Sequence, residues 1–370
     1  MKQYLYILGL ILLFSSCEKE EALSPSGLDE VAPKSEEVDM TKDLIAKWNN
    51  DYGVKICYDF DVKTDFMFAL QERQELDTWK KDTLKLFNAE SIDYGLRMLD
   101  SMVLRFFKPQ LELNGKMIAN DFIKNYFPRH IFIVDSIGSS STNYNSYSHG
   151  PYIHEPDNYE YYGHYYSILQ NGYEPAFAFN YESLHGLDKD AVTGIKKYRN
   201  SMLYCFISSL LIEKKAIDLL PAELFEPVAA LYLEDVDDLA EEEDAPVWDR
   251  FGWGNERYMY YEPQWYINKG LVLTNSSPVA TKVYGNVTMY TTILGLDSPK
   301  TIPDKERDVR NLLHLLIYET NTDNLESYYT GKVIVQRVRL MIEELYKMGI
   351  DIYEINPAAK HFFDYNFDWE

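Results

Sequence analysis

The sequence is poor in cysteine and in basic residues, and it has no apolar run long enough to cross a membrane. Only 3 of the 370 residues are cysteines, and 36 Lys and Arg oppose 59 Asp and Glu, for a formal net charge of −23. Because phosphate contacts need clustered cations, this balance argues against an electrostatic nucleic-acid binder. It also disfavours adsorption to anionic lipid through a basic patch.

Several motifs are missing as well. There is no CxxC and no close Cys/His pair, which argues against a cysteine-ligated metal. There is no glycine-rich phosphate loop and no GxSxG elbow, so kinase, Rossmann and α/β-hydrolase functions have no support. With 46% hydrophobic and 15% aromatic residues, the chain is neither disordered nor fibrous. Its length suits one large domain or two modest ones.

The first residues have the layout of a bacterial lipoprotein signal. Lys2 precedes an apolar run at residues 4–14, which would span about 16 Å as a helix, roughly half a bilayer core. The run is therefore a signal-peptide segment rather than a membrane anchor. Phe14-Ser15-Ser16-Cys17 resembles a lipobox, in which cleavage leaves an acylated cysteine. We expect residues 1–16 to be the signal peptide and Cys17 the lipidation site; the alternative is an ordinary secretory cleavage before a cysteine.

Residues 17–40 are rich in acids, Ser and Pro and cannot bury enough apolar surface to offset their ordering entropy. We predict a flexible acidic tether. Glu18, Glu20 and Glu21 resemble the surface-export signal of some outer-membrane lipoproteins, although any tether of so acidic a chain tends to be acidic. The predicted location is the outer membrane, lipid-anchored and facing the cell surface, with the membrane as a partner through the N-terminal lipid.

Apolar spacing beyond residue 40 predicts an α+β fold in a single domain, 41–370. A small N-terminal mixed α/β part covers 41–186, and a helix-rich C-terminal part covers 187–370. Val/Ile/Phe-rich runs predict strands at 54–60, 130–136 and 175–181. Helical spacing predicts helices at 41–50, 89–107, 116–126, 189–214, 222–234, 306–319 and 331–348. Residues 138–173 have the composition of a loop.

Two cysteines remain after lipidation, and both lie in apolar runs. A buried free thiol is the common state of such a cysteine. An exported compartment also permits a disulfide between Cys57 and Cys205. The sequence leaves both states open.

Several blocks, taken in order, carry a resemblance to a known family. They are Trp48-Asn49-Asn50 before the strand at 54–60, LRFFKPQ, HIFIVDS, and the C-terminal GKVIVQRVRLMIEELYKMGIDIYEI. Together they resemble the zinc-binding metallopeptidase lipoproteins, also described as substrate import-associated zinc metallohydrolase lipoproteins, which occur beside TonB-dependent outer-membrane transporters. The resemblance covers most of residues 41–357. It implies a metallopeptidase-like topology and a TonB-dependent transporter complex as a partner.

The family's long central helix carries an HEFxH-type run, in which two histidines one turn apart bind zinc and the glutamate is the general base. This chain has no HExxH. Tyr204 and Ser208 stand at the histidine positions and Cys205 at the glutamate position. A neutral tyrosine and a serine are poor zinc ligands. The resemblance therefore implies a degenerate member of the family.

The family's second acidic stretch falls near residues 306–311, after a strand that corresponds to 270–273. It places Asp308 among the degenerate metal-site positions. The neighbouring Arg307 and Arg310 would repel a cation. On the central helix, Ser201 shares a face with Tyr204, Cys205 and Ser208, and this face either lines a cleft or packs against another element.

A further candidate region, residues 143–173, is crowded with tyrosine and histidine. Tyrosine faces suit sugar or peptide recognition. The residues that we consider for contact with an oligosaccharide or peptide ligand are Tyr152, Tyr161, Tyr162, Tyr165, His149, His154 and His164. An aromatic-rich surface loop and a histidine metal site are the alternatives. The acidic run at 234–244 lacks EF-hand spacing and is interpreted as a solvated loop, and His314 as a core or boundary histidine.

These observations favour an accessory or binding component of a TonB-dependent nutrient-uptake system, without catalytic residues, metal or cofactor. The first alternative is an active zinc-dependent metallohydrolase or peptidase with a rearranged site that uses some of His149, His154, His164 and His185. The second is a structural subunit of a surface complex without a small ligand.

Overall fold

The computed structural model describes residues 38–66, 82–113, 115–139, 164–166, 168–170, 174–179, 184, 195–233, 247–251, 257–261, 263–272 and 304–365. The chain divides into two compact units, Met1–Asp43 and Leu44–Glu370. In the second unit helices outweigh short strands, which confirms the α+β class. Among the helices in these ranges, none combines the length and the apolar character that a membrane span requires.

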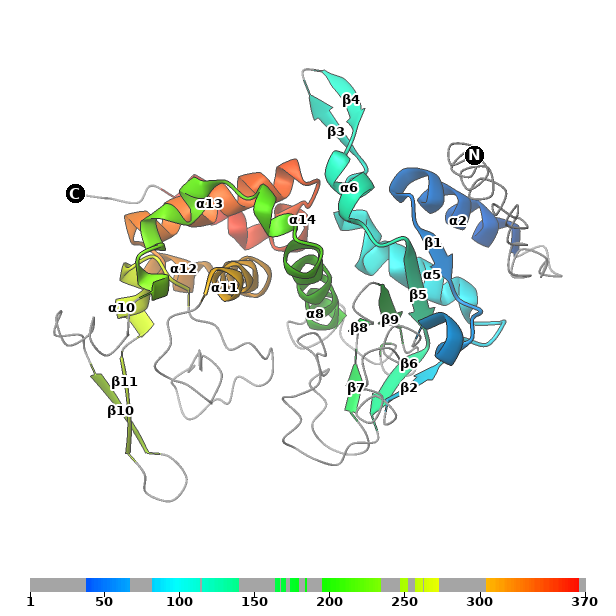
Figure 1. Ribbon diagram of the computed structural model, residues 1–370, viewed down its shortest axis with the longest axis horizontal. Helices are drawn as coiled ribbons and strands as arrows, with labels where there is room; N and C mark the ends of the chain where they lie inside the picture. The colour runs from blue at the N-terminus through cyan, green and yellow to red at the C-terminus, as the bar shows by residue number, and fades with distance from the viewer. Residues whose placement is uncertain are drawn as a thin grey trace, which may run out of the picture. The chain divides into compact units, whose positions relative to one another are not determined.

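A four-stranded sheet forms the centre of the mixed α/β part (Figure 1). Its order is β1 (Lys55–Cys57), β5 (His130–Val134), β9 (Pro175–Ala178) and β8 (Ile168–Gln170), with the first three parallel and β8 antiparallel to β9. After its first residue β5 is buried throughout, as expected for a central strand that is covered on both faces. All three predicted strands are present at shorter lengths.

Three smaller sheets accompany it. β2 (Asp82–Lys85), β6 (Ser136–Ser139) and β7 (His164–Tyr166) are antiparallel, and β10 (Val247–Phe251) pairs with β11 (Arg257–Tyr261). β3 (Gln110–Leu113) forms a hairpin with β4 (Lys116–Ala119). The prediction of a loop over 138–173 was therefore wrong where β6, β7 and β8 lie.

The described helices longer than one turn follow the predicted spacing in several places. They are α2 (Val38–Tyr52), α5 (Ile92–Met102), α6 (Asp121–Tyr126), α8 (Ile195–Ser208), α10 (Pro263–Asn268), α11 (Lys305–Tyr318), α12 (Thr322–Tyr328) and α13 (Lys332–Lys347). A π-helix, Ser209–Glu213, continues α8. The single-turn helices α14 (Ile352–Ile355) and α15 (His361–Asp364) follow α13.

Four predicted elements need correction. α2 includes residues 38–40, which were assigned to the tether. The helix expected at 116–126 begins only at Asp121, because the first four residues form β4 and Asn120 caps α6 by accepting from the backbone N–H of Phe122. The helix expected at 222–234 is a series of 3-10 turns (Ala222–Leu224, Glu226–Val228 and Leu231–Leu233), since Pro227 interrupts an α-helix. Residues 270–272 form no strand.

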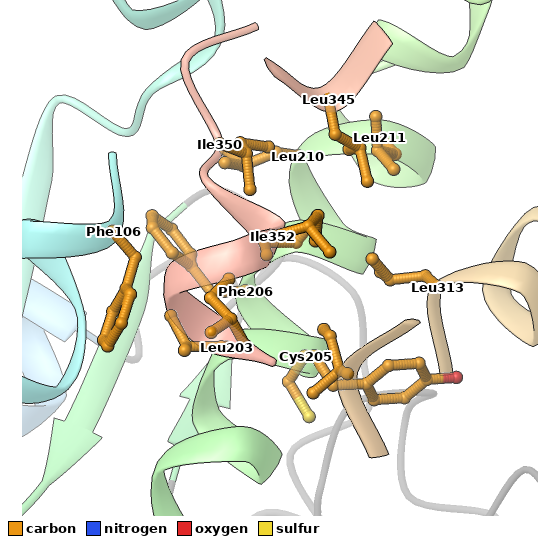
Figure 2. Close-up of a cluster of buried hydrophobic side chains, with 14 of the residues drawn as sticks. Phe106, Leu203, Cys205, Phe206, Leu210, Leu211, Leu313, Leu345, Ile350 and Ile352 are labelled. Atoms are coloured by element: carbon orange, nitrogen blue, oxygen red, sulfur yellow. The ribbon is translucent and has the colours of Figure 1, made fainter. Parts of the chain in front are cut away.

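One large core packs the apolar face of α8 against the C-terminal helices (Figure 2). Phe206 points toward Phe106, and its ring also meets Phe177 of the sheet at a centroid distance of 5.4 Å. Leu210 and Leu211 lie beside Ile350 and Leu345. α8 is therefore held between the sheet and the C-terminal helices, and its remaining face meets α11.

Candidate functional site

Three of the positions that the resemblance assigns to a degenerate metal site lie in a seam between α8 and α11. The exposed fractions are 6% for Tyr204, 0% for Cys205 and 2% for Ser208. The ring of Tyr204 meets those of His314 and Tyr318 on α11 edge-on, at centroid distances of 5.6 and 5.9 Å. The rings of His314 and Tyr318 stack at 4.5 Å. We call these five residues the α8–α11 seam, and closely packed rings fill it.

Burial sets the charge of the seam. It raises the pKa of the Tyr204 hydroxyl well above its usual range, and nearby Arg310 opposes the shift only in part. It likewise raises the pKa of the Cys205 thiol well above its ordinary value. Both groups are therefore neutral at pH 7. Since the thiolate is the nucleophile and the metal ligand, Cys205 is poorly suited to either role.

His314 is neutral for the same reason. Burial lowers the pKa of its imidazole to about 4, from an ordinary value of about 6.5. The sequence placed this residue in the core or at its boundary, and the ring lies between α8 and α11, stacked on Tyr318. Its structural environment disfavours the protonated imidazole.

A pH titration of stability tests this environment. Between pH 4 and 6.5 the unfolded chain binds a proton at His314 that the folded chain excludes. The part of the free energy of unfolding that depends on neutral His314 is therefore fully present above pH 6.5 and is lost as the pH falls toward 4. We expect the free energy of unfolding to rise by up to about 3 kcal/mol over this window. In His314→Phe this part of the slope should vanish. Tyr318→Phe is the control, which should keep the slope; an unchanged slope in His314→Phe would contradict the assignment.

Asp308 lies in a separate buried ionic network. Its side chain is fully buried, pairs with the guanidinium of Arg337 on α13, and accepts a 2.6 Å hydrogen bond from the Tyr232 hydroxyl. Arg337 also donates to the backbone carbonyls of Leu224, at 2.7 Å, and Gly270. Burial and the Asp308 charge raise the pKa of Tyr232, so its hydroxyl stays a donor. We call this set the Asp308–Arg337 network.

The helical geometry of α11 separates the two clusters. Six residues at 100° each place Asp308 about 120° around the helix from His314. Asp308 accordingly faces α13, whereas His314 faces α8. The structure therefore does not bring Asp308 together with Tyr204, Cys205 and Ser208.

The residues Tyr204, Cys205, Ser208 and Asp308 do not fit a zinc ion. Within the ranges that the structure describes, no group of three or more His, Cys, Asp or Glu side chains is arranged to hold a metal. The Asp308 carboxylate is already balanced by a guanidinium. The sequence left the state of Cys57 and Cys205 open. No disulfide joins them, so the disulfide alternative was wrong.

Most other candidates lie outside the described residues. This applies to Cys17, His149, Tyr152, His154, Tyr161, Tyr162 and His185, and to the acidic run 234–244. The backbones of His164 and Tyr165 belong to β7, where they pair with Ser139 and Gly138 of β6. A ligand site at these residues stays a prediction.

Sequence reasoning missed Arg337 and Tyr232. A signal for Arg337 was available, because it shares the helical face of Ile334, Val338 and Met341, all of which are buried. An arginine at a core position of an amphipathic helix requires a buried acid. Tyr232 carries no comparable signal, since a tyrosine in a series of short turns is compatible with many environments.

The described chain is a mixed helix-and-sheet protein in which α8 and α11 meet along a seam of aromatic rings. No family model matches it, and no curated protein does. Among solved structures, it is similar to a crystal structure named "putative zinc-binding metallo-peptidase" from Bacteroides caccae, with 14% identity over 91% of this chain and 98% of that chain. The TM-score is 0.35. The metallopeptidase family therefore remains a resemblance.

Proposed function

We propose that this chain is an outer-membrane surface lipoprotein that acts as an accessory or binding component of a TonB-dependent nutrient-uptake system. In this proposal it has a metallopeptidase-like scaffold that has lost its zinc motif. One observation carries the loss of the metal: the side chains at the two histidine positions, Tyr204 and Ser208, are buried at a seam where Tyr204 packs on His314 and Tyr318.

The chemistry of these positions argues against zinc-dependent hydrolysis. Catalytic zinc needs several imidazole or carboxylate ligands and an open position for water. Here the tyrosine and the thiol are neutral because of burial. The acid that the resemblance assigns to the metal site, Asp308, pairs with Arg337, so the guanidinium already balances the charge of this buried carboxylate.

Metal analysis tests the loss of zinc. The purified full chain is incubated with excess zinc, dialysed and analysed by mass spectrometry of the elements. We expect fewer than about 0.1 zinc ions per chain and a melting temperature that a chelator does not change. Stoichiometric zinc after dialysis would refute the loss of the metal and favour the metallohydrolase with a rearranged site, and hydrolysis that the chelator abolishes would establish it.

Lipid anchoring is tested through the cysteine itself. In the full chain, Cys17→Ala should abolish incorporation of a labelled fatty acid and release the protein from the membrane fraction, because the acyl chains supply the membrane affinity. Cys57→Ala is the matched control and should leave both unchanged. Labelling that persists in Cys17→Ala would refute the lipobox.

The accessory role has its own readouts. A binding component should co-purify with a TonB-dependent transporter and gain thermal stability with a glycan or peptide of the transported class. Co-purification without any such stabilisation would favour the structural subunit. Failure to co-purify would refute both of these roles.

A further inference from the structure

Two arginines share one aromatic ring where α8 meets the C-terminal helices. Arg105 belongs to the 3-10 helix Leu104–Phe106, which follows α5, and Arg199 belongs to the first half of α8. Their guanidinium carbons lie 5.2 and 5.1 Å from the centroid of the Phe106 ring. The two carbons are therefore no more than about 10 Å apart, and the same ring attracts both charges.

Neutral groups hold the guanidinium of Arg199 in place. Its Nη2 donates to the backbone carbonyl of Ile355, which ends α14, at 2.9 Å and to the side-chain oxygen of Asn200 at 2.8 Å. Its Nε donates to the same oxygen at 3.2 Å, and the amide of Asn200 is anchored in turn on the carbonyl of Ile317 at 3.0 Å. Among the described residues, Nη1 finds no acceptor and is not fully buried. One edge of the guanidinium is thus fixed in position and open to a ligand.

The charge of the two arginines is only half balanced. Glu354 on α14 accepts from Arg105 at 2.7 Å, whereas Arg199 has no ion pair in the described ranges. The neighbouring acid, Asp351, is paired with Lys108 at 2.5 Å. Burial lowers the pKa of the Arg199 guanidinium, the charge of Arg105 lowers it further, and Glu354 opposes the shift only in part. Two like charges with one counterion leave one positive charge in excess, and an anion beside them would lower its cost.

We propose that Arg199 and Arg105 form a site for one carboxylate group of a bound ligand. The carboxylate oxygens accept from the open Nη1 edge of Arg199, and Arg105 adds a second positive charge beside it. A planar carboxylate matches the fork of a guanidinium, and its single negative charge neutralises the excess, whereas a dianionic phosphate would exceed it. Glu354 shows the same chemistry within the chain, because its carboxylate already binds Arg105.

This site deepens the proposed binding role and rests on it. Carboxylates reach a surface binding protein as acidic sugars and as the C-termini of peptides. Both present the same planar group to a guanidinium, so the test includes both sources and the neutral counterpart of each. Binding to the purified chain needs no transporter. Carboxylate binding can therefore fail while co-purification with a transporter succeeds, and the reverse.

Thermal unfolding of the purified full chain in a nonionic detergent measures this binding. The probes are galacturonate, with galactose as its neutral counterpart, and N-acetylated trialanine, with its C-terminal amide as the counterpart. We expect at least one acid to raise the melting temperature with a dissociation constant of about 1 mM, and both neutral counterparts to leave it unchanged. Stabilisation by one acid alone identifies the source of the carboxylate. Stabilisation by neither acid, or equal stabilisation by an acid and its counterpart, would overturn the site.

Two substitutions should change the affinity in opposite directions. Arg199→Gln should weaken carboxylate binding at least about tenfold, because it removes the fork and its charge. Glu354→Gln should strengthen binding several-fold, because it removes the competing acid and leaves both guanidiniums to the ligand. A misfolded chain would not bind more tightly, so this gain distinguishes a binding site from a structural cluster. Asp93→Asn is the matched control, since Asp93 pairs with Arg97 on α5 and the net charge changes equally; it should leave the affinity unchanged. An unchanged affinity in either site variant would refute the assignment.

Discussion

Replacing Arg337 with methionine is expected to lower the free energy of unfolding by about 3–5 kcal/mol. The change leaves the Asp308 carboxylate, which is fully buried, without its cation. It also removes the donors of two backbone carbonyls, those of Leu224 and Gly270. Removing one member of a buried pair costs far more than the pair contributes, because the remaining charge stays in a medium of low polarity.

Denaturant unfolding of the full chain measures this loss, with Lys347→Met as the matched control. Lys347 lies on the same helix and bonds Glu344 at 2.5 Å, but its side chain is exposed. An exposed ion pair is worth about 0–1 kcal/mol, so the control should unfold almost as the parent does. Equal losses of unfolding free energy in the two variants would show that the Asp308–Arg337 network stabilises the fold no more than an exposed ion pair does.

A double variant separates the cost of the unpaired charge from the cost of the other lost hydrogen bonds in the network. Asp308→Leu combined with Arg337→Met removes both charges, and we expect it to recover part of the loss of Arg337→Met alone. Recovery should be incomplete, because the carbonyls of Leu224 and Gly270 still lack their donor. A double variant that is as unstable as the sum of the single changes would place the cost in packing rather than in the unpaired charge.

The sequence was informative where apolar spacing decides the element. The periodic spacing of α11 and α13 and the Val/Ile/Phe runs of β1, β5 and β9 led to the right element types, because burial on a given face enforces these periods. It was less informative for β4. Lys116–Ala119 adjoins α6 without a break in composition, and the hairpin depends on Gly115, which has φ +75° at the turn. The 3-10 turns after Leu220 were foreseeable from Pro221 and Pro227.

The candidate site shows a different limit. The resemblance places Tyr204 and Ser208 at the family's histidine positions, and this assignment stays a prediction. The ring partners of Tyr204 could not be predicted, since His314 and Tyr318 are about 110 residues away along the chain and meet α8 only through the packing of α11. Likewise Asp308 could be singled out as an acid. Its pairing with Arg337 on α13 could not, because it depends on which side of α11 packs against α13.

Gly349→Ala is expected to destabilise the chain by about 3 kcal/mol. Gly349 ends α13 in the left-handed conformation, φ +80°, with its N–H bonded to the carbonyl of Tyr346 at 2.9 Å. A Cβ there would collide with the Asn120 amide and come within 2.7 Å of the Lys108 carbonyl. That amide donates to the carbonyls of Lys108 and Met348, both at 2.9 Å, so the methyl group breaks a junction between α6 and α13.

Gly53→Ala is the matched control for this change. Gly53 has nearly the same backbone conformation, φ +67°, but a Cβ there meets nothing within 4 Å. It should therefore show the conformational penalty alone, about 1 kcal/mol. The difference between the two variants in denaturant unfolding isolates the steric part, about 2 kcal/mol, because both share the unfavourable φ. Equal destabilisation by both would mean that Asn120 moves aside without losing its hydrogen bonds, and that the α6–α13 junction tolerates a side chain.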